Sequence, residues 1–246
     1  MTVGAAGGLN IIFKTILDPD DEVIVFAPFF GEYRQYAANF DAKIVIVQPN
    51  LETFQPDLAD LEAKITARTK ALIVNTPNNP TGVIYKPQTM EQIGAILEKK
   101  QAEFGTDIYL ISDEPYRELV YDGNKEDFLT KYYRNTLVGY SFSKSLSLPG
   151  ERIGYVVVPD EAADAEELIR GIEISNRTLG FVNAPSLIQK AVARCLEEKT
   201  DVTFYDENRS RLYEGLTKLG FTCIKPEGAF YLWVKSPCLL YTSDAA

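Results

Sequence analysis

Apolar runs rich in Val and Ile recur along the chain, and helical patterns lie between them. Within each run the apolar residues are consecutive rather than alternate, which is typical of strands covered by helices on both faces. The runs span residues 22–28, 42–49, 70–77, 107–115, 136–143 and 152–159. This alternation of strand and helix predicts an α/β fold with a mostly parallel sheet.

The segment 87–105 is the clearest predicted helix. Pro87 suits a first helical turn, and Gly105 is a natural C-terminal stop. Met90, Ile93 and Leu97 recur at helical spacing, so they form one apolar face. Similar patterns predict further helices at 9–17, 57–65, 164–174, 184–199 and 205–220.

The pattern changes after about Thr203. A predicted helix is followed by residues 221–235, which we interpret as strand, turn and strand. We therefore expect a large domain over 1–202 and the start of a smaller, incomplete domain over 203–237. Residues 238–246 match no element, and we expect them to be a non-native tail.

Composition excludes several chemistries. The 246 residues contain no histidine, so a Ser-His-Asp triad, a Cys-His pair and an HExxH zinc site are all excluded. The three cysteines, Cys195, Cys223 and Cys238, are far apart and odd in number. They predict neither a metal cluster nor a disulfide framework, and they suit a reducing cytoplasm.

Charge and hydropathy exclude two kinds of partner. The formal net charge is -10, without the clustered Lys and Arg that a nucleic-acid surface needs. No apolar stretch approaches the length of a membrane helix, and no signal peptide opens the chain. We therefore expect a cytoplasmic protein that binds neither nucleic acid nor a membrane.

Unusual residues follow three of the predicted strands. They are the motifs "NTPNNPTG" after 71–74, "SDEPY" after 108–111 and "SFSK" after 136–140. The opening "GAAGG" precedes a helical pattern. Ligands of open α/β sheets bind beyond the carboxyl ends of the strands, so these segments should meet at one edge.

Each of these residues also has an ordinary structural explanation. Lys144 alone is most simply a solvated lysine, and Asp113 could close a turn before Pro115. Arg152 could be a surface ion-pair partner, and Phe30 a core residue. The combination is more specific, because a lysine amine, a buried acid, an amide, a tyrosine and an arginine beside hydroxyls could hold a phosphorylated, cationic heteroaromatic ring.

Three motifs resemble those of class I aminotransferases, in the same order. Residues 141–154 resemble the lysine-attachment motif, and 78–82 and 112–116 resemble two others. The likeness covers about residues 2–235. It implies the large domain of a fold-type I enzyme dependent on pyridoxal 5′-phosphate, with a sheet of about seven strands flanked by helices. It implies no metal site.

The resemblance assigns roles by position. Lys144 resembles the lysine that forms a Schiff base with the cofactor and then shuttles the substrate proton. Asp113 would pair with the pyridinium nitrogen, while Asn79 and Tyr116 would hydrogen-bond the ring oxygen O3′. Lys144, Asp113 and Tyr116 are therefore the predicted catalytic residues.

The remaining predicted contacts hold the ring and the phosphate. Phe30 falls where the family stacks an aromatic ring on the cofactor. The predicted phosphate ligands are Ser141, Arg152, the more weakly indicated Ser143, and the backbone amides of Gly4, Ala5 and Ala6. The resemblance also predicts cis peptides at Ala27–Pro28 and Asn79–Pro80.

The implied activity is transfer of an amino group between an L-amino acid and a 2-oxo acid, by a homodimer when full length. The N-terminal segment of the family and the arginine that clamps the substrate carboxylate would lie outside this chain. Three alternatives stay open: another fold-type I enzyme such as a C–S or C–C lyase or a decarboxylase, a non-catalytic sensor domain, or an inactive fragment.

Overall fold

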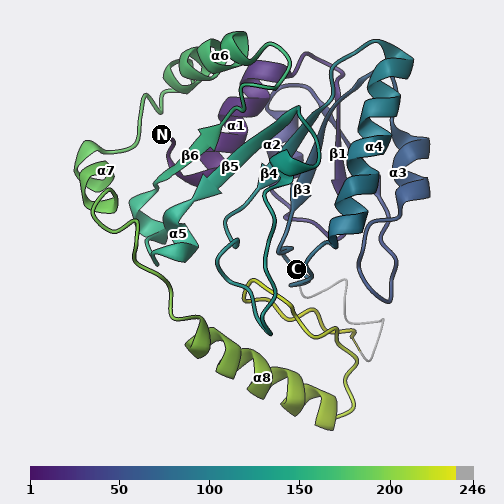
Figure 1. Cartoon of the computed structure of the whole chain (residues 1–246), viewed down its shortest axis with the longest axis vertical. Coiled ribbons are helices and arrows are strands. Elements are labelled where there is room, and N and C mark those ends of the chain that lie inside the picture. Colours follow the sequence, from purple (N-terminus) through teal and green to yellow (C-terminus); the bar gives the residue numbers. More distant parts are fainter. Residues whose placement is uncertain (237–246) are drawn as a thin grey trace.

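A six-stranded sheet organises residues 1–236, the part of the chain that this computed structural model describes (Figure 1). The strand order is β2-β1-β3-β4-β5-β6, and every neighbouring pair is parallel except β5 and β6. The strands are β1 (Glu22–Phe26), β2 (Lys43–Val47), β3 (Thr69–Asn75), β4 (Tyr109–Asp113), β5 (Thr136–Ser141) and β6 (Gly154–Val157). The predicted α/β class and mostly parallel sheet are confirmed, and each strand lies inside a predicted run except β3, which begins one residue earlier, at Thr69.

No strand forms over 221–235, where strand, turn and strand were predicted, and the described sheet has six strands where about seven were expected. Cys223 and Val234 form only an isolated bridge. The amides of Glu227 and Gly228 donate to the Gly82 carbonyl at 2.8 and 2.9 Å, and the Ala229 amide donates to Leu119 at 2.8 Å. Apart from that bridge and the bond from the Lys235 amide to the Thr222 carbonyl at 2.8 Å, the segment pairs with two loops at the carboxyl end of the sheet.

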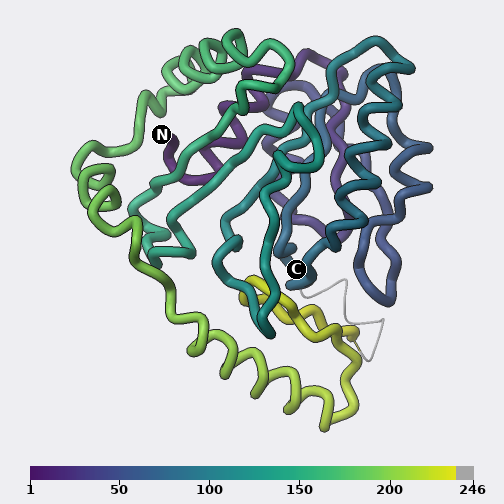
Figure 2. Tube along the Cα trace, in the orientation of Figure 1, coloured from purple at the N-terminus to yellow at the C-terminus, as the bar shows by residue number. Residues whose placement is uncertain are grey.

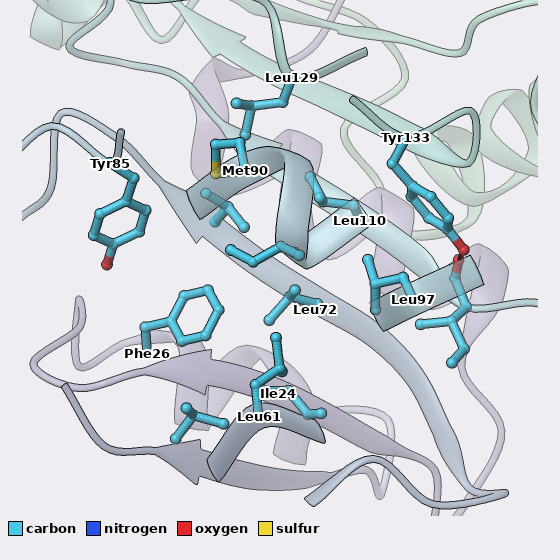
Figure 3. Close-up of a cluster of buried hydrophobic side chains, with 14 of the residues drawn as sticks. Ile24, Phe26, Leu61, Leu72, Tyr85, Met90, Leu97, Leu110, Leu129 and Tyr133 are labelled. Atoms are coloured by element: carbon cyan, nitrogen blue, oxygen red, sulfur yellow. Dashed lines mark hydrogen bonds between the residues drawn. The ribbon is translucent and has the colours of Figure 1, made fainter. Parts of the chain in front are cut away.

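One face of the sheet is covered by α3 (Leu58–Lys64) and α4 (Pro87–Phe104). Leu72 and Leu110 of the strands are fully buried against Leu61 of α3 and Leu97 of α4 (Figure 3). The apolar face predicted from Met90, Ile93 and Leu97 is the buried face of α4, and the helix ends at Gly105 in the left-handed conformation. Full burial of each such leucine contributes about 1.5–3 kcal/mol.

The opposite face is covered by α1 (Gly4–Ile16) and α6 (Ala165–Thr178). Phe13 of α1 and Leu168 of α6 belong to this second apolar cluster, with Val23 and Ile73 of the strands. Helix α1 begins five residues before the predicted position, so the "GAAGG" motif lies inside it. Its small residues allow a close approach, since a Cβ on Gly8 would lie 3.2 Å from Val156.

The remaining elements are short or peripheral: α2 (Tyr33–Ala38), η1 (Leu129–Lys131), α5 (Phe142–Ser145), η2 (Pro149–Glu151), α7 (Ser186–Val192) and α8 (Val202–Lys218). Helix α7 covers less than the predicted 184–199. Helix α8 begins before the predicted position because the Asp201 side chain caps its first turn by accepting from the amides of Thr203 and Phe204.

Figure 2 shows α8 and the segment after it running along the end of the sheet, apart from the helices that cover its faces. The domain boundary near residue 203 stays a prediction, and the predicted tail 238–246 lies outside the described residues. Within residues 1–236, no helix has both the length and the apolar character needed to cross a membrane.

Candidate active site

A pocket of about 270 Å³ lies where β3, β4 and β5 end. It is lined by ten of the predicted site residues: Ala5, Ala6, Phe30, Asn79, Asp113, Tyr116, Ser141, Ser143, Lys144 and Arg152. Gly4 is adjacent, because a Cβ on it would lie 2.9 Å from the Arg152 guanidinium. The fold thus brings together residues as far apart in the sequence as Gly4 and Arg152, which are separated by 148 positions.

Asp113 is the last residue of β4 and is buried. One carboxylate oxygen, Oδ2, accepts a hydrogen bond of 2.5 Å from the Tyr33 hydroxyl. The other, Oδ1, is buried and has no partner among the described residues. Burial raises the pKa of Asp113 to about 6, against the opposing effect of the Tyr33 hydrogen bond. A buried carboxylate oxygen without a partner is a strong acceptor for a cationic N–H donor.

Tyr33 is a pocket residue that the sequence analysis missed. It begins α2, lies fully buried and lines the pocket. Burial and the neighbouring Asp113 raise the pKa of Tyr33 well above its usual range, so its hydroxyl stays a donor. In the local pattern "PFFGEYRQY", Tyr33 cannot be distinguished from an aromatic residue that only packs in the core.

Asn75, the last residue of β3, was also missed, although it lies in the motif "NTPNNPTG". Its Nδ2 donates to the Asp113 carbonyl at 2.8 Å, and its Oδ1 accepts from the Asn79 amide at 2.7 Å. It thereby fixes both the end of β4 and the loop that carries Asn79. The predicted cis peptides at Ala27–Pro28 and Asn79–Pro80 are confirmed, and Thr76–Pro77 is also cis.

Lys144 lies in α5, directly after β5, and is half-buried. Burial lowers the pKa of its amine, and the positive charge of Arg152 adds to this effect. A lysine of lowered pKa has a larger neutral fraction and is a better nucleophile. The carbonyls of Lys144 and Ser145 both accept from the Thr200 hydroxyl, at 3.0 and 2.5 Å, which fixes the backbone of the lysine.

Tyr116 lines the same pocket and contacts two aromatic residues of the C-terminal segment. Its hydroxyl is 2.6 Å from that of Tyr231, and its ring meets Phe230 edge-on. The Lys144 amine is 5.0 Å from the Phe230 ring centroid. Burial, followed by the Tyr231 hydrogen bond, raises the pKa of Tyr116 well above its usual range. Neither Phe230 nor Tyr231 was a predicted site residue.

Two hydroxyls and a guanidinium also line the pocket. The Ser141 side chain caps α5 by accepting from the Ser143 amide at 3.1 Å, and the two hydroxyls are 2.6 Å apart. Arg152 lies against Gly4 at the start of α1, whose first turn contains no acidic residue. A helix N-terminus, hydroxyls and an arginine form an anion site.

Aromatic side chains line the remaining wall. The Phe30 ring meets Tyr33 edge-on, with centroids 5.6 Å apart, and also lines the pocket. Glu32 and Tyr36, both missed by the sequence analysis, line the pocket and are hydrogen-bonded to each other. The arrangement as a whole fits pyridoxal phosphate: an orphaned carboxylate oxygen for the ring nitrogen, an amine for the carbonyl carbon and an anion site for the phosphate.

Comparison with known proteins identifies the family of the chain. The family model for aminotransferase class I and II matches residues 1–239. Among curated relatives, the aspartate aminotransferase of Thermotoga maritima is 32% identical over 96% of this chain and 60% of its own length. The aspartate/prephenate aminotransferase of Thermus thermophilus is 33% identical over 94% of this chain and 59% of its own length.

Solved structures of aminotransferases are similar to this chain as well. An aminotransferase from Eubacterium rectale superposes with a TM-score of 0.94 at 51% identity, over 96% of this chain and 59% of that one. A variant of the Thermus thermophilus aspartate aminotransferase gives a TM-score of 0.83 at 32% identity, over 96% of this chain and 64% of that one. The chain thus spans about 60% of the length of the relatives it matches.

Proposed function

The chain belongs to the class I and II aminotransferase family, whose members depend on pyridoxal phosphate, and from this premise we propose that the whole protein is an aminotransferase. It would move an amino group between an L-amino acid and a 2-oxo acid. Asp113 carries the proposal: its buried, unpartnered Oδ1 belongs to the same pocket as the Lys144 amine. That pair suits a cationic ring joined to a carbonyl.

When bound, pyridoxal phosphate supplies a carbonyl that exchanges amines and a ring that accepts the electron pair released at the substrate Cα. Asp113 has the task of keeping a proton on the ring nitrogen. A carboxylate held by Tyr33 on one oxygen presents the other in a fixed direction. The cation it faces would lower the pKa of Asp113 from about 6, so the carboxylate stays ionised at neutral pH.

The Lys144 amine has two tasks in this proposal. It would attach the cofactor and, once substrate displaces it, would carry the proton from the substrate Cα to the cofactor carbon that the lysine had held. Both tasks need a neutral amine, which burial and Arg152 favour by lowering the pKa of Lys144. The hydrogen bonds from Thr200 keep the lysine backbone in one place during the exchange.

The other pocket residues bind and orient. Asn79 and Tyr116 would donate to the ring oxygen, and Phe30 would stack on the ring. The phosphate would accept from Ser141, Ser143, Arg152 and the amides at the start of α1, which would anchor the ring while the lysine is displaced. The substrates and the homodimeric state are proposals that rest on the family.

Reduction with borohydride tests the attachment site. The chain is incubated with pyridoxal phosphate, reduced and mapped by mass spectrometry, and we expect the adduct on Lys144. Lys144→Ala should abolish it, while Lys70→Ala, on β3, should leave it unchanged. An adduct that persists on another lysine would contradict the assignment.

A product assay tests the reaction class. The full-length protein is supplied with several amino donors and 2-oxoglutarate, and we expect glutamate to form. Release of ammonia or carbon dioxide without glutamate would indicate a lyase or a decarboxylase instead.

A further inference from the structure

The hydroxyl of Tyr116 makes an unusual contact for a group expected to bind a cofactor. It lies 2.6 Å from the hydroxyl of Tyr231, and either oxygen can be the donor. A phenol has one proton to give. If Tyr116 gives it to Tyr231, none is left for an acceptor in the pocket. If Tyr231 donates, Tyr116 keeps its own proton and accepts at the same time.

Tyr231 is held firmly in place to make this contact. Its backbone follows residues 227–229, whose amides bond to Gly82 and Leu119. The Glu227 carboxylate accepts from the Ile84 amide at 3.1 Å, which ties the segment to the loop carrying Asn79. The Gly82 position cannot carry a side chain, because a Cβ there would lie 3.0 Å from the Tyr231 carbonyl oxygen and its φ is +74°.

The neighbouring Phe230 supports the same geometry. It stacks on Tyr205 of α8 with centroids 5.9 Å apart and meets the Tyr116 ring edge-on at 5.4 Å. Tyr116 is therefore fixed by aromatic contacts on its ring and by Tyr231 at its hydroxyl. An additional hydrogen bond to the oxygen of a donor polarises its O–H bond and makes it a better donor.

We propose that Tyr231 is a positioning residue of the active site: with cofactor bound, its hydroxyl donates to Tyr116, so that the single Tyr116 proton is directed at the ring oxygen. The inference rests on the proposed function. It extends the site into the C-terminal segment, which the sequence analysis assigned to a different domain. In this proposal Tyr231 influences the cofactor through Tyr116 alone.

A double-mutant cycle tests the proposal on protein loaded with pyridoxal phosphate. The absorbance of the bound cofactor is titrated against pH in the wild type, Tyr231→Phe, Tyr116→Phe and the double variant. Donors to the ring oxygen favour the unprotonated cofactor, so Tyr116→Phe should raise its pKa. Tyr231→Phe should raise it by roughly half to one pH unit, since it weakens one hydrogen bond. When Tyr116→Phe is already present, adding Tyr231→Phe should not raise the pKa of the cofactor further.

Tyr205→Phe is the matched control, because it removes a hydroxyl from the same aromatic cluster and keeps the Tyr116–Tyr231 hydroxyl pair, and it should leave the titration unchanged. An unchanged titration in Tyr231→Phe, or an equal shift with and without Tyr116, overturns the positioning role while leaving the proposed function intact. A wild type that shows no pH-dependent cofactor absorbance and no adduct on Lys144 overturns both.

Discussion

Residues 1–157, the sheet region, and residues 202–236, the C-terminal region, are held in place by different forces. In the sheet region two apolar clusters cover the two faces, and the strands β3, β4 and β5 are buried almost throughout. In α8 of the C-terminal region the one buried side chain is a charged one, Arg209, while Phe204, Leu212 and the residue that follows the helix, Leu219, are more than half exposed. The first region is ordered by its own core, and the second by a few polar and aromatic contacts with the first.

The division matters because the site draws on both regions. Lys144, Asp113 and the phosphate-binding candidates belong to the sheet region, whereas Tyr231 and Phe230 belong to the C-terminal region. The sheet region therefore holds most of the candidate site, and the C-terminal region, which buries fewer apolar side chains, adds contacts to Tyr116 and Lys144. Variants that disturb one region at a time should separate the two contributions.

The largest expected difference is in stability. Leu72→Ala truncates a fully buried side chain of β3 that packs under α3 and α4. We expect it to lower the free energy of unfolding by about 2–5 kcal/mol. Leu212→Ala changes a side chain that is 58% exposed, and we expect a change within about 0.5 kcal/mol. Urea denaturation of both variants measures the contrast, and equal losses would mean that α8 is as tightly packed as the sheet.

The second prediction concerns the pH dependence that burial of Asp113 imposes on the sheet region. Its pKa is raised from 3.8 to about 6 in the folded chain, so folding binds its proton more tightly. In the cofactor-free chain, its contribution to stability should therefore be lost as the pH rises from about 4 to about 6, with a slope of about 1.4 kcal/mol per pH unit, and stay constant above that range.

Asp113→Asn isolates this contribution, because the amide oxygen still accepts from Tyr33 but does not titrate. The difference in unfolding free energy between variant and wild type, measured at several pH values, should grow across the window in favour of Asn. A flat difference would show that the carboxyl is already ionised in the folded chain at low pH.

The third prediction removes the main polar anchor of the C-terminal region. Arg209 is 8% exposed, donates to Asp122 from both Nη1 and Nη2 at 3.0 and 2.9 Å, and also contacts Asp206 and the Pro226 carbonyl. Arg209→Ala should cost about 1–3 kcal/mol locally, because Asp206 loses this cation and Asp122 keeps its ion pair with Lys225 alone among the described residues. Hydrogen exchange should speed up at the amides of Gly228 and Ala229 and stay slow in β4.

Arg211→Ala is the control for this anchor. Arg211 lies on the same helix, is paired with Glu207 at 3.7 Å and with no other acidic residue in the part of the chain that the structure describes, and has a side chain that is 78% exposed. Its loss should leave the exchange pattern unchanged. Faster exchange in β4 of the Arg209 variant would contradict the division into two regions.

The same division explains how far the sequence could predict this molecule. Strands of the sheet region could be predicted because their burial on both faces leaves consecutive apolar residues, as in 70–77. The segment 221–235 carries similar residues, but its partners are the backbone groups of Gly82 and Leu119, which no local pattern reveals. The site shows the same limit. Lys144 and Asp113 stand in motifs, whereas Tyr33 and Tyr231 act through hydroxyl contacts between residues 80 and 115 positions apart.

The smallest effect, and the sharpest test of how the two regions meet, is at Thr200, two residues before α8. Its hydroxyl shares one proton between the carbonyls of Lys144 and Ser145. Thr200→Val keeps the shape and removes this bond, so it should cost about 0.5–1.5 kcal/mol, whereas Thr200→Ser keeps the donor and should stay close to the wild type. Because the bond ends on the lysine backbone, the rate of borohydride-trapped attachment to Lys144 should fall several-fold in the valine variant and recover in the serine variant. Equal attachment rates in both would show that the Lys144 backbone is fixed by α5 and its Ser141 cap alone, and that the C-terminal region reaches the site only through Phe230 and Tyr231.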